Sequence, residues 1–243
     1  MKKIIFRVIL FALLITIALF SIRSHQKNRE VERLVAAFRE GREFNEVISN
    51  ERFRYYHVPR ETFTDAFADS ELLFPGMNGD LLVSLETPFP QIPIVNQLFP
   101  FFFGGHAAVS FGPEIIDITG NFLRTDINYV RRSENDFITN YRLKTFIGLR
   151  IINATENDFE ITNNFYKESI GMRYNYFFLF GRNSRTYCTD LIRKAWNQPG
   201  LSRNFQLYSH RLFVSVQDLI LSPDTEIFMY KYVDRNLVTH IYF

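Results

Sequence analysis

The N-terminal part of the chain carries two hydrophobic patterns in succession. After two lysines, an apolar run extends from Ile4 to Ile22 and is interrupted by a single charge, Arg7. Residues 24–50 are strongly charged, and their apolar positions follow the i, i+3, i+4, i+7 spacing of one helix face: Val31, Leu34, Val35 and Phe38. The two patterns predict a helix of membrane-spanning length and then an amphipathic helix that ends at Gly41.

The remainder of the chain switches between strand and helix patterns. Short apolar segments predict strands at 81–85, 107–111, 115–118 and 146–152. Gly112 and Pro113 separate the second of these from the third and predict a hairpin. Helices are predicted at 156–169, with Thr155 as the N-cap, and at 189–197, before Pro199 and Gly200. This order predicts an α+β domain with a small antiparallel sheet and packed helices.

These patterns divide the chain into three parts. Residues 1–23 form a membrane anchor or signal segment, residues 24–75 a helical linker region, and residues 76–243 one folded domain. A signal peptide needs small residues before its cleavage site, and Phe20 and Ile22 are poor residues there. We therefore favour an uncleaved single-pass anchor over residues 4–22. A short N-terminal tail before a long domain favours a cell-membrane protein whose domain lies outside the cytoplasm.

Composition and charge exclude several classes of protein. The chain has 243 residues, 47% hydrophobic and 22% charged, so it is neither disordered nor a multi-span membrane protein. The net charge is +2, and residues 24–243 alone carry 24 basic and 26 acidic residues. We therefore expect no nucleic-acid partner. The single cysteine excludes an intramolecular disulfide and any multi-cysteine metal site.

That single cysteine, Cys188, lies where the helix of residues 189–197 is predicted to begin. A thiol at a helix N-terminus is close to backbone N–H groups and to the positive end of the helix dipole, which both favour the thiolate. The same N–H groups can stabilise an oxyanion. The alternative is a buried structural cysteine, which is a common role for a lone cysteine.

A histidine and an acid lie on the two strands of the predicted hairpin. His106 follows two glycines at the start of one strand, and Asp117 comes eleven residues later, on the second strand. A cysteine nucleophile needs a nearby base, and the base needs an acceptor that orients it. His106 and Asp117 supply these two groups if they share a face of the sheet. The other histidines have no metal-site spacing, so we expect no metal.

The order of several short motifs resembles a known family. The motifs are Gly79-Asp80-Leu81-Leu82, Gly105-His106-Ala107-Ala108-Val109, Ile116-Asp117-Ile118-Thr119-Gly120, Gly171-Met172-Arg173-Tyr174-Asn175 and Tyr187-Cys188-Thr189-Asp190-Leu191-Ile192. This series, over residues 76–225, resembles the YiiX-type circularly permuted papain-like cysteine hydrolases. These are relatives of the NlpC cell-wall peptidases and of lecithin–retinol acyltransferase. In the permuted group the histidine strand precedes the cysteine helix, as it does here.

The resemblance implies a role for four residues. Cys188 matches the nucleophile, His106 the general base, and Asp117 the polar third member, which in the family is often Glu. Tyr174 matches a tyrosine that helps to hold the oxyanion in related enzymes. The sequence departs from the family pattern after the cysteine, where Thr189-Asp190 replaces the more usual Ser-Glu.

The predicted function is that of a membrane-anchored thiol hydrolase with a Cys-His-Asp triad. It would cleave an amide or ester bond of a peptidoglycan peptide or an acylated substrate through an acyl-enzyme, with no cofactor. The aromatic segments 98–103 and 176–180 keep a second interpretation open, a lipid amidase or acyltransferase. A third is a catalytically inactive, anchored binding module.

Overall fold

The computed structural model describes most of the chain. The described residues are 2–40, 45–49, 53–57, 77–86, 105–120, 128–139, 144–176, 178, 184–207 and 213–243. The helices are α1 (Lys2–Glu40), α4 (Glu156–Glu168), α5 (Cys188–Ala195) and α6 (Val216–Ile220). The strands are β1 (Asn45–Ser49), β2 (Phe53–His57), β3 (Leu81–Ser84), β4 (His106–Phe111), β5 (Glu114–Asp117), β6 (Arg131–Glu134), β7 (Thr145–Ile151), β8 (Arg173–Tyr174), β9 (Arg185–Thr186), β10 (Thr225–Val233) and β11 (Thr239–Tyr242).

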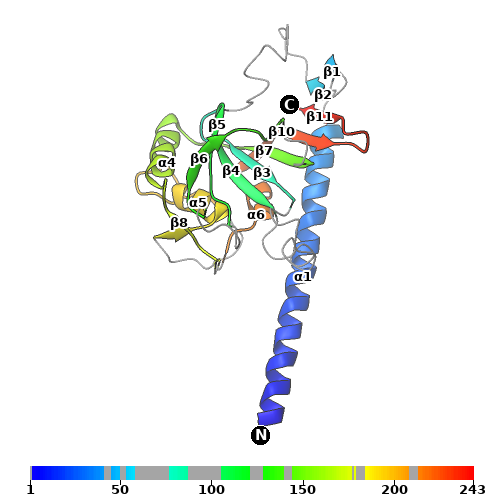
Figure 1. Ribbon diagram of the computed structural model, residues 1–243, viewed down its shortest axis with the longest axis vertical. Coiled ribbons are helices and arrows are strands. Elements are labelled where there is room, and N and C mark those ends of the chain that lie inside the picture. The colour runs from blue at the N-terminus through cyan, green and yellow to red at the C-terminus, as the bar shows by residue number, and fades with distance from the viewer. Residues whose placement is uncertain are drawn as a thin grey trace.

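A nine-stranded sheet organises the domain (Figure 1). Its strand order is β1-β2-β11-β10-β7-β3-β4-β5-β6, and every neighbouring pair is antiparallel except β11 and β2, which are parallel. The short strands β8 and β9 form a separate parallel pair. The α+β prediction is therefore confirmed, but the sheet is much larger than the small one expected.

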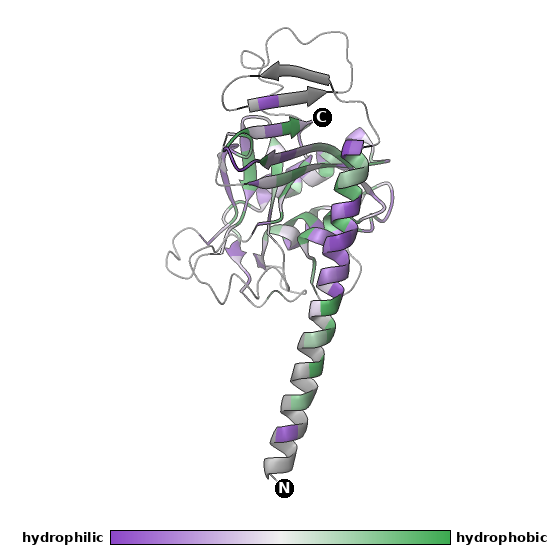
Figure 2. Cartoon of the chain, turned by 90° about the vertical axis from the view of Figure 1, so that its right-hand side faces the viewer, coloured by the Kyte–Doolittle hydropathy of each residue, from purple (hydrophilic) through white to green (hydrophobic). Residues whose placement is uncertain are grey.

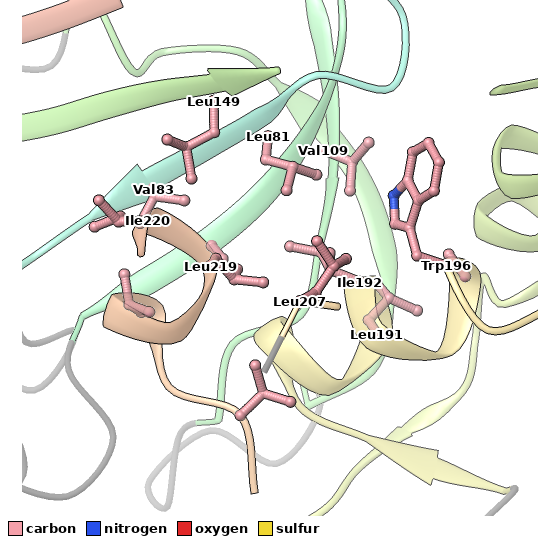
Figure 3. Packing of buried hydrophobic residues seen from close by; sticks show 14 of the residues in the cluster. Leu81, Val83, Val109, Leu149, Leu191, Ile192, Trp196, Leu207, Leu219 and Ile220 are labelled. Atoms are coloured by element: carbon pink, nitrogen blue, oxygen red, sulfur yellow. The ribbon is translucent and has the colours of Figure 1, made fainter. Parts of the chain in front are cut away.

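The two faces of the sheet bury different sets of side chains. Along β3, Leu81 and Val83 face the main core, and Leu82 faces a second, smaller cluster, as the two-residue period of a strand requires. Figure 3 shows side chains of the sheet meeting those of α5 and α6 in the main core. Fully burying one aliphatic side chain stabilises a fold by about 1.5–3 kcal/mol. The burial of Leu191 and Ile192 therefore contributes much of the free energy that holds α5 against the sheet.

The start of α4 has a capping box that the sequence predicted in part. The Thr155 hydroxyl accepts from the Asp158 N–H at 3.2 Å, and the Asp158 carboxylate accepts from the Thr155 N–H at 2.8 Å. Asp158 also accepts hydrogen bonds from the backbone N–H and the hydroxyl of Ser202. These bonds outweigh the effect of burial and lower the pKa of Asp158 to about 2.

Helix α1 differs most from the expectation. The apolar run and the amphipathic stretch form one continuous helix of 39 residues, and its N-terminal half projects from the domain (Figure 1). The helix ends just before Gly41, as predicted, but residues 45–49 and 53–57 of the supposed helical linker are strands β1 and β2. Among the described residues, no helix is both long and apolar enough to cross a membrane.

Candidate active site

Cys188 is the first residue of α5, and the segments around it are fixed by hydrogen bonds on both sides. The hydroxyl of Tyr187, the N-cap residue, accepts from the backbone N–H of Val214 at 3.0 Å. The hydroxyl of Thr189 donates to the carbonyl of Val214 at 2.7 Å. The thiol itself is half-buried. Cys188 is thus held at a helix N-terminus, as the sequence predicted, and remains accessible.

His106 is the first residue of β4, and a close backbone contact fixes where that strand begins. The preceding residue, Gly105, has a φ of +65°, and a Cβ built on it would lie 1.6 Å from the carbonyl oxygen of Ser84. Only glycine fits this approach. Gly105 therefore allows β4 to pair with β3 directly from His106, which lies opposite Ser84 in the register.

The hairpin brings His106 and Asp117 together. Asp117, the last residue of β5, lies opposite Ala108, which is two residues after His106 and therefore shares its face of the sheet. The Nε2 atom of His106 lies 3.0 Å from Oδ2 of Asp117. The strand alternation that the sequence left open thus places the two side chains on one face, within hydrogen-bonding distance.

Two further side chains hold the Asp117 carboxylate. The hydroxyl of Thr119 donates to Oδ2 at 3.2 Å, and Nε of Arg131, from β6, lies 3.4 Å from Oδ1. Burial alone raises the pKa of Asp117, but the hydrogen bond with His106 and the charges of His106 and Arg131 lower it below its ordinary value. Asp117 is therefore a carboxylate at neutral pH.

The surroundings of His106 favour its protonated form. Its side chain is 15% exposed, and burial by itself lowers its pKa. Hydrogen bonds with Asp117 and with Cys188, together with the charges of both, outweigh burial and raise the pKa of His106 to about 10. The imidazole thus interacts with both the Asp117 carboxylate and the Cys188 side chain.

Tyr174 lies in a buried aromatic group beside these residues. Its ring centroid is 4.9 Å from that of Tyr176 and 6.0 Å from that of Phe178, and the ring fills the space where Gly120 lacks a Cβ. Burial, followed by the charge of Cys188, raises the pKa of Tyr174 well above its ordinary value. Its hydroxyl therefore keeps its proton and can serve as a hydrogen-bond donor.

A cavity of about 340 Å³ opens next to His106 and Asp117. Its wall includes Arg131 and Phe137, and the Phe137 ring stacks on His106 with centroids 6.4 Å apart. Thr119, Arg131 and Phe137 also lie at this site, although the sequence did not point to them. Thr119 belongs to the motif Ile116-Asp117-Ile118-Thr119-Gly120. No local pattern marks Arg131 or Phe137, because the pairing of β6 with β5 places Arg131 at the site and a turn places Phe137 there.

Some sequence predictions lie outside the described residues. The aromatic segment 98–103 is among them, and of the segment 176–180 the structure describes Tyr176 and Phe178. Within the described part of the chain, no group of three or more His, Cys, Asp or Glu side chains is placed to hold a metal ion.

Comparisons with known proteins give limited information. No family model matches the sequence, and no curated protein matches it. A solved structure described as metalloprotein yiiX from Escherichia coli O157:H7, DUF1105, is similar, with a TM-score of 0.44 and 13% sequence identity. The match covers 62% of this chain and 95% of that chain.

Proposed function

We propose that this chain is a membrane-anchored thiol hydrolase that cleaves an amide or ester bond through an acyl-enzyme. One observation carries the proposal. The ring of His106 lies 3.0 Å from the Asp117 carboxylate and also interacts with Cys188, at the N-terminus of α5. A nucleophile, a base and an orienting acid in this order are the elements of cysteine acyl transfer.

The first chemical step follows from the positions of the three side chains. Because Nε2 of His106 is bound to Asp117, Nδ1 is the ring nitrogen available to the thiol. In the resting state the thiol proton already lies on His106, so the Cys188 thiolate attacks the carbonyl carbon directly. The backbone N–H of Cys188 and the Tyr174 hydroxyl would stabilise the oxyanion, and one such donor contributes about 2.7–4 kcal/mol.

The second half of the reaction uses the same histidine. The imidazolium donates its proton to the leaving amine or alcohol as the tetrahedral intermediate collapses to the thioester. His106 then removes a proton from water, which attacks the thioester and releases the carboxylic acid and the free thiol. Asp117 keeps the imidazole oriented throughout, and Arg131 and Thr119 keep Asp117 in place.

We also propose that residues 4–22 anchor the protein in the cell membrane, with the domain outside the cytoplasm. The support is the apolar run itself and the projection of this half of α1 away from the domain.

The single cysteine makes the proposal directly testable. In the full-length protein in detergent, the rate of alkylation by iodoacetamide is measured as a function of pH. We expect an inflection well below the free-thiol value of about 8.5. The variant His106→Ala is expected to move the inflection up to about that value, because the thiolate loses its counter-ion.

The chain offers a matched control. His240 forms a second histidine–aspartate pair, with Nε2 3.1 Å from Oδ2 of Asp234. His240→Ala should leave the alkylation profile of Cys188 unchanged. An inflection near 8.5 in the wild type, indifferent to His106→Ala, would contradict the proposal and favour an anchored binding module.

A further inference from the structure

The two halves of α1 have different surroundings. In Figure 2 the half of α1 that lies against the domain is coloured mainly as hydrophilic, and the described residues of the projecting half are coloured mainly as hydrophobic. The helix is continuous from Lys2 to Glu40, so whatever binds the projecting half also fixes the position of the domain.

The docked half of α1 is attached to the domain by several kinds of contact. Val31, Val35 and Phe38 are buried in the main core. At the other end of the helix, the Arg39 guanidinium lies 5.2–5.9 Å from the ring centroids of three tyrosines: Tyr230, Tyr232 and Tyr242. From Val31 to Arg39 these contacts extend over more than two helical turns. The domain is therefore held in one orientation relative to the helix axis.

The projecting half exposes large apolar side chains. Phe11, Ile15, Leu19 and Ile22 are between 44% and 66% exposed. In the sequence the run from Ile4 to Ile22 is apolar around the whole helix apart from Arg7, Thr16 and Ser21, which is typical of a membrane span and not of a helix that pairs along one stripe. Its 19 residues span about 28 Å at 1.5 Å per residue, close to the roughly 30 Å of a bilayer core.

Almost no spacer separates this run from the domain. Ser24, two residues after Ile22, is already buried against the protein. One turn later, Nζ of Lys27 lies 2.7 Å from the Asp218 carboxylate, and Asn28 accepts a hydrogen bond of 2.9 Å from Gln217. A bilayer around residues 4–22 would therefore lie directly against the end of the domain that carries α6.

The contacts of α6 lead directly to Cys188. Val214, two residues before Val216 at the start of α6, binds both neighbours of the cysteine through its backbone, the Tyr187 hydroxyl and the Thr189 hydroxyl. In Figure 1, α5 and α6 lie toward the projecting end of α1, and β1, β2 and β11 lie at the opposite end of the domain.

From these contacts we infer that the candidate site is fixed at the surface of a lipid bilayer and acts on acyl bonds of molecules that reside in that membrane. The inference rests on the proposed function for its chemistry and on α1 for its geometry. A soluble peptide in bulk water would not need a nucleophile held within a few helical turns of the membrane surface.

The test uses the solitary cysteine as a position marker. The full-length protein is reconstituted in phosphatidylcholine–phosphatidylglycerol vesicles, and Cys188 is labelled at alkaline pH with a small bimane fluorophore. Lipids with a nitroxide on the headgroup quench only nearby fluorophores. We expect strong quenching at Cys188, comparable with that of a probe at His25→Cys, an exposed position on α1 beside the junction.

Two comparisons calibrate the result. On a Cys188→Ala background, a probe at Asn236→Cys in the exposed β10–β11 turn should be quenched little, and one at Phe213→Cys, next to Val214, should match Cys188. Inserting seven helix-forming residues between Arg23 and Ser24 raises the domain by about 10 Å and should abolish quenching at Cys188.

Quenching of the probe at His25→Cys without quenching at Cys188 or Phe213→Cys would overturn the inference. A protein that forms dimers through residues 4–22 and does not insert into vesicles would also overturn it. Neither result would alter the iodoacetamide profile, so the proposed chemistry and the proposed location can fail separately.

Discussion

At the scale of single residues, the neighbours of a histidine decide what it can do. Among the residues that the structure describes, two histidine–aspartate pairs have nearly equal geometry: His106 with Asp117 at 3.0 Å and His240 with Asp234 at 3.1 Å. His240 stacks on the Tyr232 ring, with centroids 4.6 Å apart and the rings nearly parallel. His106 instead interacts with a cysteine. Of the two histidines, His106 is therefore the one on which the proposed chemistry depends.

The raised pKa of His106 predicts how stability depends on pH. The folded protein keeps the His106 proton up to about pH 10, whereas the unfolded chain releases it near the ordinary value of 6.5. The stability contributed by this proton is therefore fully present below about pH 6.5 and is lost as the pH rises toward 10. Urea unfolding between pH 6 and 10 should show a decline in the free energy of unfolding that is weaker in His106→Ala. An equal decline in both proteins would contradict the assigned pKa.

At the scale of elements, the β4–β5 hairpin places His106 beside Asp117. Glycines precede and follow β4, and both have positive φ angles, +65° at Gly105 and +70° at Gly112. Their surroundings differ. A Cβ on Gly112 would meet nothing within 4 Å, but one on Gly105 would overlap the Ser84 carbonyl. Gly105 is thus needed for both backbone conformation and close packing.

The two glycines form a matched pair of test sites. Gly112→Ala should cost about 1–2 kcal/mol of unfolding free energy, the price of the left-handed conformation alone. Gly105→Ala should lower the unfolding free energy by about 1–3 kcal/mol more than Gly112→Ala does, because the backbones of β3 and β4 have to separate. Denaturant titration of both variants checks this. Equal losses would show that the approach of Gly105 to Ser84 is not tight.

At the scale of the whole molecule, α1 is part of the core as well as an extension from it. Phe38 is 8% exposed and belongs to the same hydrophobic cluster as the residues of α5 and the sheet. Leu34, one turn earlier on the same helix, is 40% exposed. The folded domain therefore begins within α1, about fifty residues before the boundary that the sequence suggested at residue 76.

This shared core predicts a large difference between two positions of one helix. Phe38→Ala should lower the free energy of unfolding by about 3–5 kcal/mol, because it leaves a cavity between α1 and the domain. Leu34→Ala should change it by less than about 0.5 kcal/mol. Urea unfolding of the full-length protein in detergent measures both. Similar small effects would show that the domain is stable without α1.

The local elements and the residues of the candidate site could be predicted from the sequence. The Gly112-Pro113 turn predicted the hairpin, the Thr155 cap predicted the start of α4, and the position of Cys188 predicted its place at the start of a helix; the structure has all three. These features depend on contacts between residues close in the chain, so a periodicity or a turn residue is enough to reveal them.

The way in which distant segments combine could not be predicted from the sequence and is visible in the folded molecule. β2 pairs with β11, nearly two hundred residues later, and thereby adds the supposed linker to the main sheet. Arg131 reaches Asp117 because β6 pairs with β5, and Val214 fixes the start of α5 across a gap in sequence. Such contacts leave no local pattern, because the free energy that selects them comes from burial and hydrogen bonding across the whole domain.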